Sequence, residues 1–251
     1  MAEVGLKERL AAGEKLVGAI IMTASPEVAE VLSVSGLGLV MIDHEHGAGG
    51  LDSFIAQSRA ILGSGMAAMV RFPGGDFRYA RRLLDNGARA LVCPSVDTAD
   101  QAHAYVDACR YPPRGSRGAG AGLRGAGYGT DASYYTQEAE DRTLLVAQIE
   151  SAEAVRNIDA ICAVDGIDML LIGPRDLSAS IGKLGRFNDP ELLELLAFSE
   201  ERILASGKLL ASTLHQGKTC SQMFDAGYSV ILAGKDVDFL LNGAKALVSG
   251  A

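Results

Sequence analysis

The sequence alternates between short apolar runs and longer segments in which apolar residues recur at helical spacing. Short apolar runs bounded by Gly, Pro or charged residues are typical of buried strands. Eight such runs predict strands over Leu16–Met22, Leu39–Asp43, Ala67–Phe72, Ala90–Cys93, Leu144–Ile149, Met169–Ile172, Leu209–Thr213 and Val230–Ala233.

Helical segments are predicted between these strands. They cover Pro26 to about Ser35, Leu51–Leu62, Phe77–Asn86, Thr98–Cys109, a short piece near Ser133–Asp141, Ser151–Ile161, Asp189–Ser206, Thr219–Ala226 and Val237–Val248. The Gly-, Arg- and Pro-rich segment Tyr111–Tyr128 is expected to be irregular. An amphipathic segment, Leu6–Ala12, precedes the first strand and is expected to close the bottom of a barrel.

Eight βα units in 251 residues, without repeats or a composition break, predict a single domain over residues 1–251 with a (β/α)8 TIM-barrel fold. An open doubly wound sheet is the alternative. The barrel is preferred because no GxGxxG motif follows the first strand.

Composition narrows the range of partners. A net charge of −8 argues against nucleic acid or an anionic membrane as the main partner. The four cysteines are far apart and form no CxxC pair, which suggests reduced side chains in a cytoplasmic protein. No apolar run has the length of a transmembrane helix, and residues 1–10 lack the features of a signal peptide.

Ionisable residues follow several of the predicted strands. The second strand opens into the stretch LVMIDHEHGAGG, which contains Asp43, His44 and His46. The other candidates at strand ends are Arg71 after the third strand, Gln148 and Glu150 at the fifth, and Arg175 and Asp176 after the sixth. In a (β/α)8 barrel these ends meet on one face, so these side chains are expected to share one site.

The residue types indicate their chemistry. Glu150 and Asp176 supply hard oxygen ligands suited to Mg²⁺ or Mn²⁺; alternatively, Asp176 caps a helix. Arg71 would direct a permanent charge at a carbonyl or carboxylate oxygen, unless it forms a salt bridge across the barrel mouth. His46 could transfer a proton near neutral pH, and His44 is an alternative that the pattern does not exclude.

The sequence resembles the HpcH/HpaI family of metal-dependent class II pyruvate aldolases from about Gly18 to Val248. The matching stretches are IDHEHG (42–47), VRFP (70–73), RLLDNGA (82–88), RYPPRGSRG (110–118), QIE (148–150) and IGPRDLSAS (172–180).

The resemblance implies a role for each matching residue. Glu150 and Asp176 would bind a divalent metal ion, Mg²⁺ or Mn²⁺, with Co²⁺ a third candidate. Arg71 would bind the keto oxygen, and Gln148 would lie beside the metal. The resemblance also implies that His46 rather than His44 is the base, with Asp85 as the partner of His46. Backbone N–H groups around Arg175 and Asp176 would hold the carboxylate of the donor.

The implied reaction is a reversible aldol addition between a 2-oxo acid, such as pyruvate or hydroxypyruvate, and an aldehyde. Relatives assemble as hexamers, trimers of dimers, so a homo-oligomer is expected. No lysine lies at a strand end in the first six units, which favours the metal route over a lysine imine; Lys208 and Lys235 are the remaining candidates. A citryl- or malyl-CoA-type lyase and a noncatalytic binding barrel are the alternatives.

Three departures from the family pattern bear on substrate choice. The chain has no Trp, and Ile20 stands where many relatives have one. The segment Leu209–Gln216 is more polar than in relatives, and the loop Gly115–Gly129 is unusually rich in glycine. These departures do not affect the predicted catalytic residues. They leave the identity of the acceptor aldehyde undetermined.

Asp85 introduces a conflict with the barrel. It ends the third predicted helix, at the bottom of the barrel, whereas His46 lies at the top. A strand of five or six residues is roughly 17–20 Å long. Asp85 is therefore expected to reach a His46 of a neighbouring chain, with the apolar helix Val237–Val248 packing between subunits. Alternatively, Asp85 caps its helix or pairs with Arg81 or Arg82.

Overall fold

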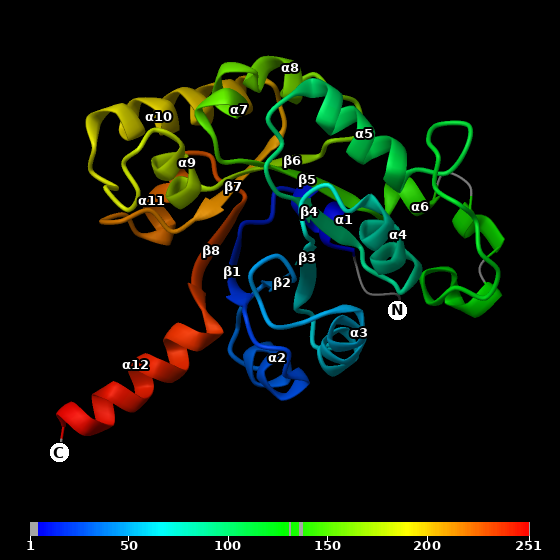
Figure 1. Ribbon diagram of the computed structural model, residues 1–251. Coiled ribbons are helices and arrows are strands. Elements are labelled where there is room, and N and C mark those ends of the chain that lie inside the picture. The colour runs from blue at the N-terminus through cyan, green and yellow to red at the C-terminus, as the bar shows by residue number, and fades with distance from the viewer. Residues whose placement is uncertain (1–4, 131, 136–137, 251) are drawn as a thin grey trace.

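The computed structural model of the protein describes residues 5–130, 132–135 and 138–250. Eight parallel strands form a closed barrel in which each strand pairs with its neighbours in the sequence and β1 pairs with β8 (Figure 1). The strands are β1 (Leu16–Ile21), β2 (Leu39–Asp43), β3 (Ala67–Arg71), β4 (Ala90–Cys93), β5 (Leu144–Ile149), β6 (Met169–Ile172), β7 (Leu209–Thr213) and β8 (Val230–Lys235). The predicted (β/α)8 barrel is confirmed.

Helices lie between the strands on the outside of the barrel, with one more before β1 and one after β8. They are α1 (Leu6–Ala11), α2 (Pro26–Ser33), α3 (Leu51–Ala60), α4 (Phe77–Asp85), α5 (Ala99–Cys109), η1 (Arg124–Gly129), η2 (Ala132–Tyr135), α6 (Glu138–Asp141), α7 (Ala152–Arg156), α8 (Ile158–Cys162), α9 (Pro174–Ser180), α10 (Pro190–Ala205), α11 (Cys220–Asp225) and α12 (Asp236–Ser249). Among these described helices, none is long and apolar enough to cross a membrane.

The apolar residues form two main layers. Alternate strand residues such as Met41, Met69 and Met169 fill the inside of the barrel, and the outward-facing residues pack against the helices. Leu6 and Leu10 of α1 belong to the inner cluster, so the predicted closure of the barrel bottom is confirmed.

The helices differ from the prediction at two places. The helix predicted over Ser151–Ile161 is divided into α7 and α8 at Asn157, whose side chain donates a hydrogen bond to the carbonyl oxygen of Asp97 (2.8 Å). This hydrogen bond connects the break between α7 and α8 to the loop that follows β4. The structure also contains α9, directly after β6, where the sequence analysis expected a helix start near Asp176 but gave no helix range. Pro174 starts it, as proline favours the first position of a helix.

The last helix, α12, extends away from the barrel instead of lying along it (Figure 1). Among the described residues of α12, only Asp236 is buried. The Asp236 carboxylate accepts hydrogen bonds from the N–H groups of Met22 and Thr23. Beyond this anchor the helix exposes large apolar side chains. They are Val237, Phe239, Leu240, Leu241, Leu247 and Val248.

Candidate active site

A cavity of about 620 Å³ opens at the carboxyl end of the barrel strands. Six of the residues that the sequence pattern singled out line it: Asp43, His46, Arg71, Gln148, Arg175 and Asp176. The ends of β2, β3, β5 and β6 therefore meet at one site, as the barrel geometry requires.

Arg71 is held by the buried carboxylate of Asp43, its register partner on β2. The Nε group donates to Asp43 Oδ1 (3.0 Å) and the Nη2 group to Oδ2 (2.5 Å). Burial alone would raise the pKa of Asp43, but the hydrogen bonds and charge of Arg71 hold it below its ordinary value. The sequence analysis considered such a salt bridge only as an alternative to ligand binding. The structure allows both, because the hydrogen bonds to Asp43 use only the Nε and Nη2 groups.

Asp43 also organises the loop that carries the histidines. Its Oδ1 atom accepts the backbone N–H groups of Glu45 (3.0 Å) and His46 (3.3 Å). Glu45 in turn lies 3.3 Å from Arg71 Nε and 3.7 Å from His46 Nε2. One buried carboxylate thus fixes the guanidinium and the start of the loop together.

The two histidines lie in different surroundings. His46 lines the cavity, and its side chain is 60% exposed. His44 is buried; its Nδ1 atom lies 2.9 Å from the hydroxyl of Tyr79, and its Nε2 atom has no partner in the described chain. Burial lowers the pKa of His44. Of the two, only His46 is placed to meet a ligand in the cavity.

Glu150 is a buried carboxylate behind the cavity wall. Its Oε1 atom accepts hydrogen bonds from the backbone N–H (2.7 Å) and hydroxyl (3.0 Å) of Ser95, and its Oε2 atom accepts one from Gln148 Nε2. Burial raises the pKa of Glu150; the Ser95 hydrogen bonds oppose this effect, and the charges of Asp176 and Glu45 add to it. A cation at this point would stabilise the charged form of the carboxylate.

Ser95 was not predicted as a site residue. It follows β4 and has a φ of 54°, a left-handed conformation that is uncommon for serine and directs both of its donors at Glu150. The sequence offered only a polar residue after the fourth strand, which on its own is a weak signal.

The donor set fits a hard divalent cation. In the described residues no group of three or more His, Cys, Asp or Glu side chains is arranged to hold a metal ion. Glu150 and exposed Asp176 would therefore supply two carboxylates, with water or substrate oxygens completing the shell, as is usual for Mg²⁺. The buried Gln148 Oε1 atom, which has no partner in the described chain, also lies at this end of the barrel. A Cβ atom at Gly173 would lie 3.0 Å from Glu150 Oε2, so the absence of a side chain keeps this approach open.

Asp85 lies at the end of α4, away from this cavity. Its Oδ1 atom accepts a hydrogen bond from Arg117 Nη2 (2.7 Å), and its side chain is 28% exposed. Arg117 is buried against the ring of Tyr111, with the guanidinium carbon 4.5 Å from the ring centroid. The partner of Asp85 within the chain is thus Arg117 of the RYPPRGSRG stretch, rather than Arg81 or Arg82.

Known proteins resemble the chain in both sequence and structure. Residues 18–242 match the model of the HpcH/HpaI aldolase/citrate lyase family. The chain is 36% identical over 243 residues to a hydroxypyruvate/pyruvate aldolase of Cupriavidus necator, covering 97% of this chain and 90% of that protein. The chain belongs to the HpcH/HpaI aldolase/citrate lyase family.

Two further relatives agree with this assignment. A 4-hydroxy-2-oxovalerate aldolase of Novosphingobium aromaticivorans is 39% identical over 239 residues, covering 95% of this chain and 90% of that protein. A crystal structure of a family protein from Burkholderia cenocepacia matches with a TM-score of 0.92 at 31% identity, covering 98% of each chain. The protein is therefore an enzyme of the aldolase type, a carbon–carbon lyase, and the predicted family is confirmed. The CoA-lyase alternative has less support, because these curated relatives are aldolases.

Proposed function

We propose that the protein is a metal-dependent class II aldolase that joins pyruvate or hydroxypyruvate to an aldehyde and cleaves the product in reverse. The observation that carries this proposal is one cavity lined by a fixed guanidinium, an exposed histidine and the Asp176 carboxylate, with the Glu150 carboxylate buried behind its wall. The names of the hydroxypyruvate/pyruvate aldolases among its relatives support the choice of donor.

Each residue has a distinct task in this proposal. Glu150 and Asp176 hold the divalent cation, which supplies Lewis-acid polarisation of the keto group. The donor carboxylate binds backbone N–H groups of Arg175 and Asp176, in the first turn of α9, where such groups lack helical partners. Arg71, fixed by Asp43, stabilises the negative charge that develops on the keto oxygen.

His46 then accepts a proton from the carbon next to the keto group. Glu45, 3.7 Å from His46 Nε2, stabilises the positive charge that the ring gains. A new carbon–carbon bond forms between the deprotonated carbon and the aldehyde carbon, and the aldehyde oxygen takes up a proton to become a hydroxyl.

Incubation with pyruvate or hydroxypyruvate, a panel of aldehydes and Mn²⁺ tests this function. We expect 4-hydroxy-2-oxo acids to form, detected by chromatography and mass spectrometry, and the same acids to be cleaved in the reverse direction. A purified, folded enzyme that forms no such product with any donor would contradict the proposal.

The Arg71→Lys variant should be poorly active, because an ammonium group cannot reproduce the fork that binds Asp43 and a ligand oxygen together. We expect kcat for proton exchange at the pyruvate methyl group to fall on the order of 10²-fold, as for a lost oxyanion donor. Circular dichroism should show an unchanged fold. Arg71→Lys with wild-type exchange would remove Arg71 from the mechanism.

Ile20 lines the cavity, at the position where the family resemblance implies a Trp in many relatives. The Ile20→Trp variant should therefore change the ranking of acceptor aldehydes by kcat/KM while the affinity for Mn²⁺ stays the same. An unchanged aldehyde profile would show that this part of the wall does not contact the acceptor.

We further propose that the enzyme is a homo-oligomer, a hexamer built from dimers, in which α12 packs against a neighbouring chain. The exposed face of α12 supports this proposal: Leu240, Leu247 and Val248 are 64%, 79% and 81% exposed. A contiguous apolar surface of this kind is typical of an interface. Asp85 would then approach His46 of the neighbouring chain with the carboxylate oxygen that Arg117 does not bind.

A further inference from the structure

The side chain of Arg117 is buried although it carries a charge, and it binds a carboxylate that is partly exposed. The exposed fraction is 1% for the Arg117 side chain and 28% for that of Asp85. The Nη2 group donates to Asp85 Oδ1 (2.7 Å), and the Nε group has no partner in the described chain. Burial of a charge is costly, and a buried ion pair often stabilises a fold no better than apolar side chains of similar volume. Stability alone therefore does not account for an arginine at this position.

Two tyrosine side chains hold the guanidinium group of Arg117 in place. Its carbon lies 4.5 Å from the centroid of the Tyr111 ring and 5.8 Å from that of the Tyr134 ring, within the range of cation–π attraction. The Nη2 group also donates to the Tyr134 hydroxyl (3.4 Å). Because a guanidinium group is planar and rigid, these contacts restrict its orientation and fix the point at which it binds Asp85.

The backbone before Arg117 is fixed as well. The chain turns back on the end of α5, where the N–H of Ser116 donates to the carbonyl oxygen of Asp107 (2.8 Å) and the N–H of Arg117 to that of Arg110 (2.9 Å). A Cβ atom at Gly115 would lie 2.5 Å from both carbonyl oxygens, so glycine is needed for this close approach. The turn therefore places the Arg117 side chain in a defined position beside α4.

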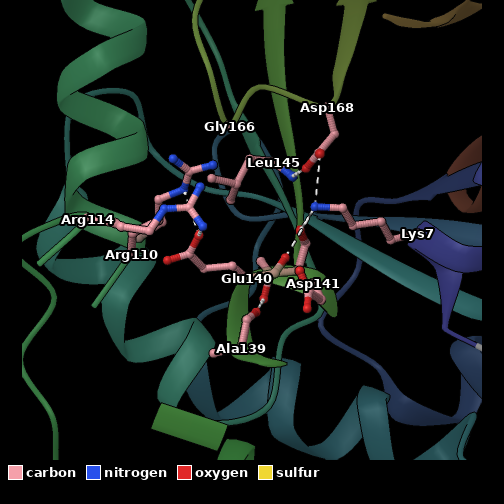
Figure 2. A pocket seen from close by; sticks show the side chains of 11 residues that line it. Lys7, Arg110, Arg114, Ala139, Glu140, Asp141, Leu145, Gly166 and Asp168 are labelled. Carbon is pink, nitrogen blue, oxygen red and sulfur yellow. Dashed lines mark hydrogen bonds and ion pairs between the residues drawn. The ribbon is translucent and has the colours of Figure 1, made fainter. Parts of the chain in front are cut away.

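The other two arginines of the same stretch have a different partner. Arg110 and Arg114 bind Glu140 (3.3 and 2.8 Å) in a small pocket at the bottom of the barrel (Figure 2). Arg117 instead binds Asp85, which the proposed mechanism places in catalysis. Arg117 is thus the arginine of this stretch that contacts a residue with a proposed catalytic role.

The ion pair leaves one oxygen of Asp85 for another group. It uses Oδ1, and Asp85 stands at the end of α4 with its side chain partly exposed. In the proposed oligomer the Oδ2 atom approaches His46 of the neighbouring chain. A carboxylate held through one oxygen has lost much of its rotational freedom, so the direction of its second oxygen is set before the subunits meet.

We propose that Arg117 is a positioning residue that directs Asp85 Oδ2 toward His46 of the neighbouring chain. Arg117 therefore serves the site of that neighbouring chain and not the cavity of its own chain. This inference rests on the proposed aldolase function and on the proposed sharing of sites between chains, and it adds a residue that neither of them requires.

Arg117→Met removes the charge, keeps an extended side chain and leaves an Asp85 carboxylate that water can reach, so the fold should survive. We expect kcat for proton exchange at the pyruvate methyl group to fall roughly ten- to a hundredfold, as for a misplaced catalytic group. KM for pyruvate and the affinity for Mn²⁺ should stay at the wild-type values. Arg117→Lys keeps the charge but not the planar fork, and it should recover part of the loss.

Mixing of variants under conditions that permit subunit exchange identifies the site that Arg117 serves. Arg117→Met mixed with His46→Ala should exceed the mean exchange rate of the two unmixed variants, because some sites combine an intact His46 with an intact Arg117 and Asp85. Arg117→Met mixed with Asp85→Ala should only reach that mean, because each chain then supplies a defective pair. The reverse pattern would place Arg117 in the site of its own chain and overturn the proposal.

Arg114→Met is the matched control, because it makes the same change in the same stretch at a side chain that binds Glu140. It should exchange pyruvate protons as the wild type does. If Arg117→Met fails to fold, Arg117→Lys takes its place in both mixtures. Wild-type kcat in Arg117→Met, an equal loss in Arg114→Met, or weaker binding of pyruvate or Mn²⁺ by Arg117→Met would overturn the proposal.

Two results would overturn the premises instead. A wild type that exchanges no pyruvate protons would contradict the aldolase function. An active wild type in which His46→Ala and Asp85→Ala do not recover activity on mixing would contradict the sharing of sites, and the role of Arg117 with it.

Discussion

Glu150→Gln and Asp176→Asn should each abolish aldol cleavage and pyruvate proton exchange, lowering kcat on the order of 10³-fold or more. The expected size follows from losing several kcal/mol of charge stabilisation by a bound cation, at 1.36 kcal/mol for each factor of ten. Both replacements preserve side-chain shape, and Glu150→Gln can keep accepting the hydrogen bonds of Ser95 through its amide oxygen. The fold should therefore survive.

Calorimetric titration with Mn²⁺ provides a readout that is independent of turnover. Both variants should bind Mn²⁺ much more weakly than the wild type. Glu45→Gln is the matched control, because Glu45 is a third carboxylate near Arg71 that is not assigned to the metal. It should retain Mn²⁺ binding. Wild-type Mn²⁺ affinity in Glu150→Gln or Asp176→Asn would remove that residue from the proposed metal site.

His46→Ala and Asp85→Ala should each be nearly inactive alone and partly active when mixed. The loss of a general base costs roughly 10²–10⁴-fold, and His44→Ala should cost far less because His44 does not line the cavity. If each site takes His46 from one chain and Asp85 from another, a mixed dimer contains one intact site. After random exchange of subunits in a one-to-one mixture, roughly a quarter of all sites would be intact.

The proton-exchange rate of the mixture, followed over time under conditions that permit subunit exchange, measures this recovery. A mixture of His46→Ala with Glu150→Gln is the control and should show no recovery. Both residues belong to the same chain's site, so each site of a mixed dimer lacks one of them. Mixing either variant with itself should yield no recovery. An active monomer, or Asp85→Ala with normal exchange, would contradict the shared site.

The barrel could be predicted from sequence because its strands are short apolar runs separated by strong turn signals. The strand ranges differ from the structure by one or two residues at most, the largest difference being β8, which extends to Lys235. The bulge at Ala233 is the reason: it depends on how β8 pairs with β1, which no local pattern reveals.

The helices were predicted less well where long-range contacts decide their ends. The break at Asn157 depends on a hydrogen bond to Asp97, sixty residues earlier. The projection of α12 from the barrel depends on Asp236, whose carboxylate is bound by the end of β1. Its apolar character was recognised, but the direction of the helix was not.

At the candidate site the sequence could indicate which residues converge, but not how they contact each other. The sequence analysis predicted one shared site for Arg71, Gln148, Asp176 and His46 because they follow strands. In the structure all four line the same cavity. The β2–β3 register places Asp43 beside Arg71, and this register allows the ion pair between them. An unusual backbone conformation at Ser95 directs its donors to Glu150. Neither is visible in a single sequence.

The central claim is that a divalent cation held by Glu150 and Asp176 allows His46 to remove a proton from the donor. Deuterium incorporation into the methyl group of pyruvate, followed by NMR in D₂O without any aldehyde, measures this step alone. The account predicts rapid exchange with Mg²⁺ or Mn²⁺, none above background in EDTA, and recovery when metal is restored. Full exchange in EDTA, together with covalent trapping of pyruvate on Lys235 by borohydride, would contradict it.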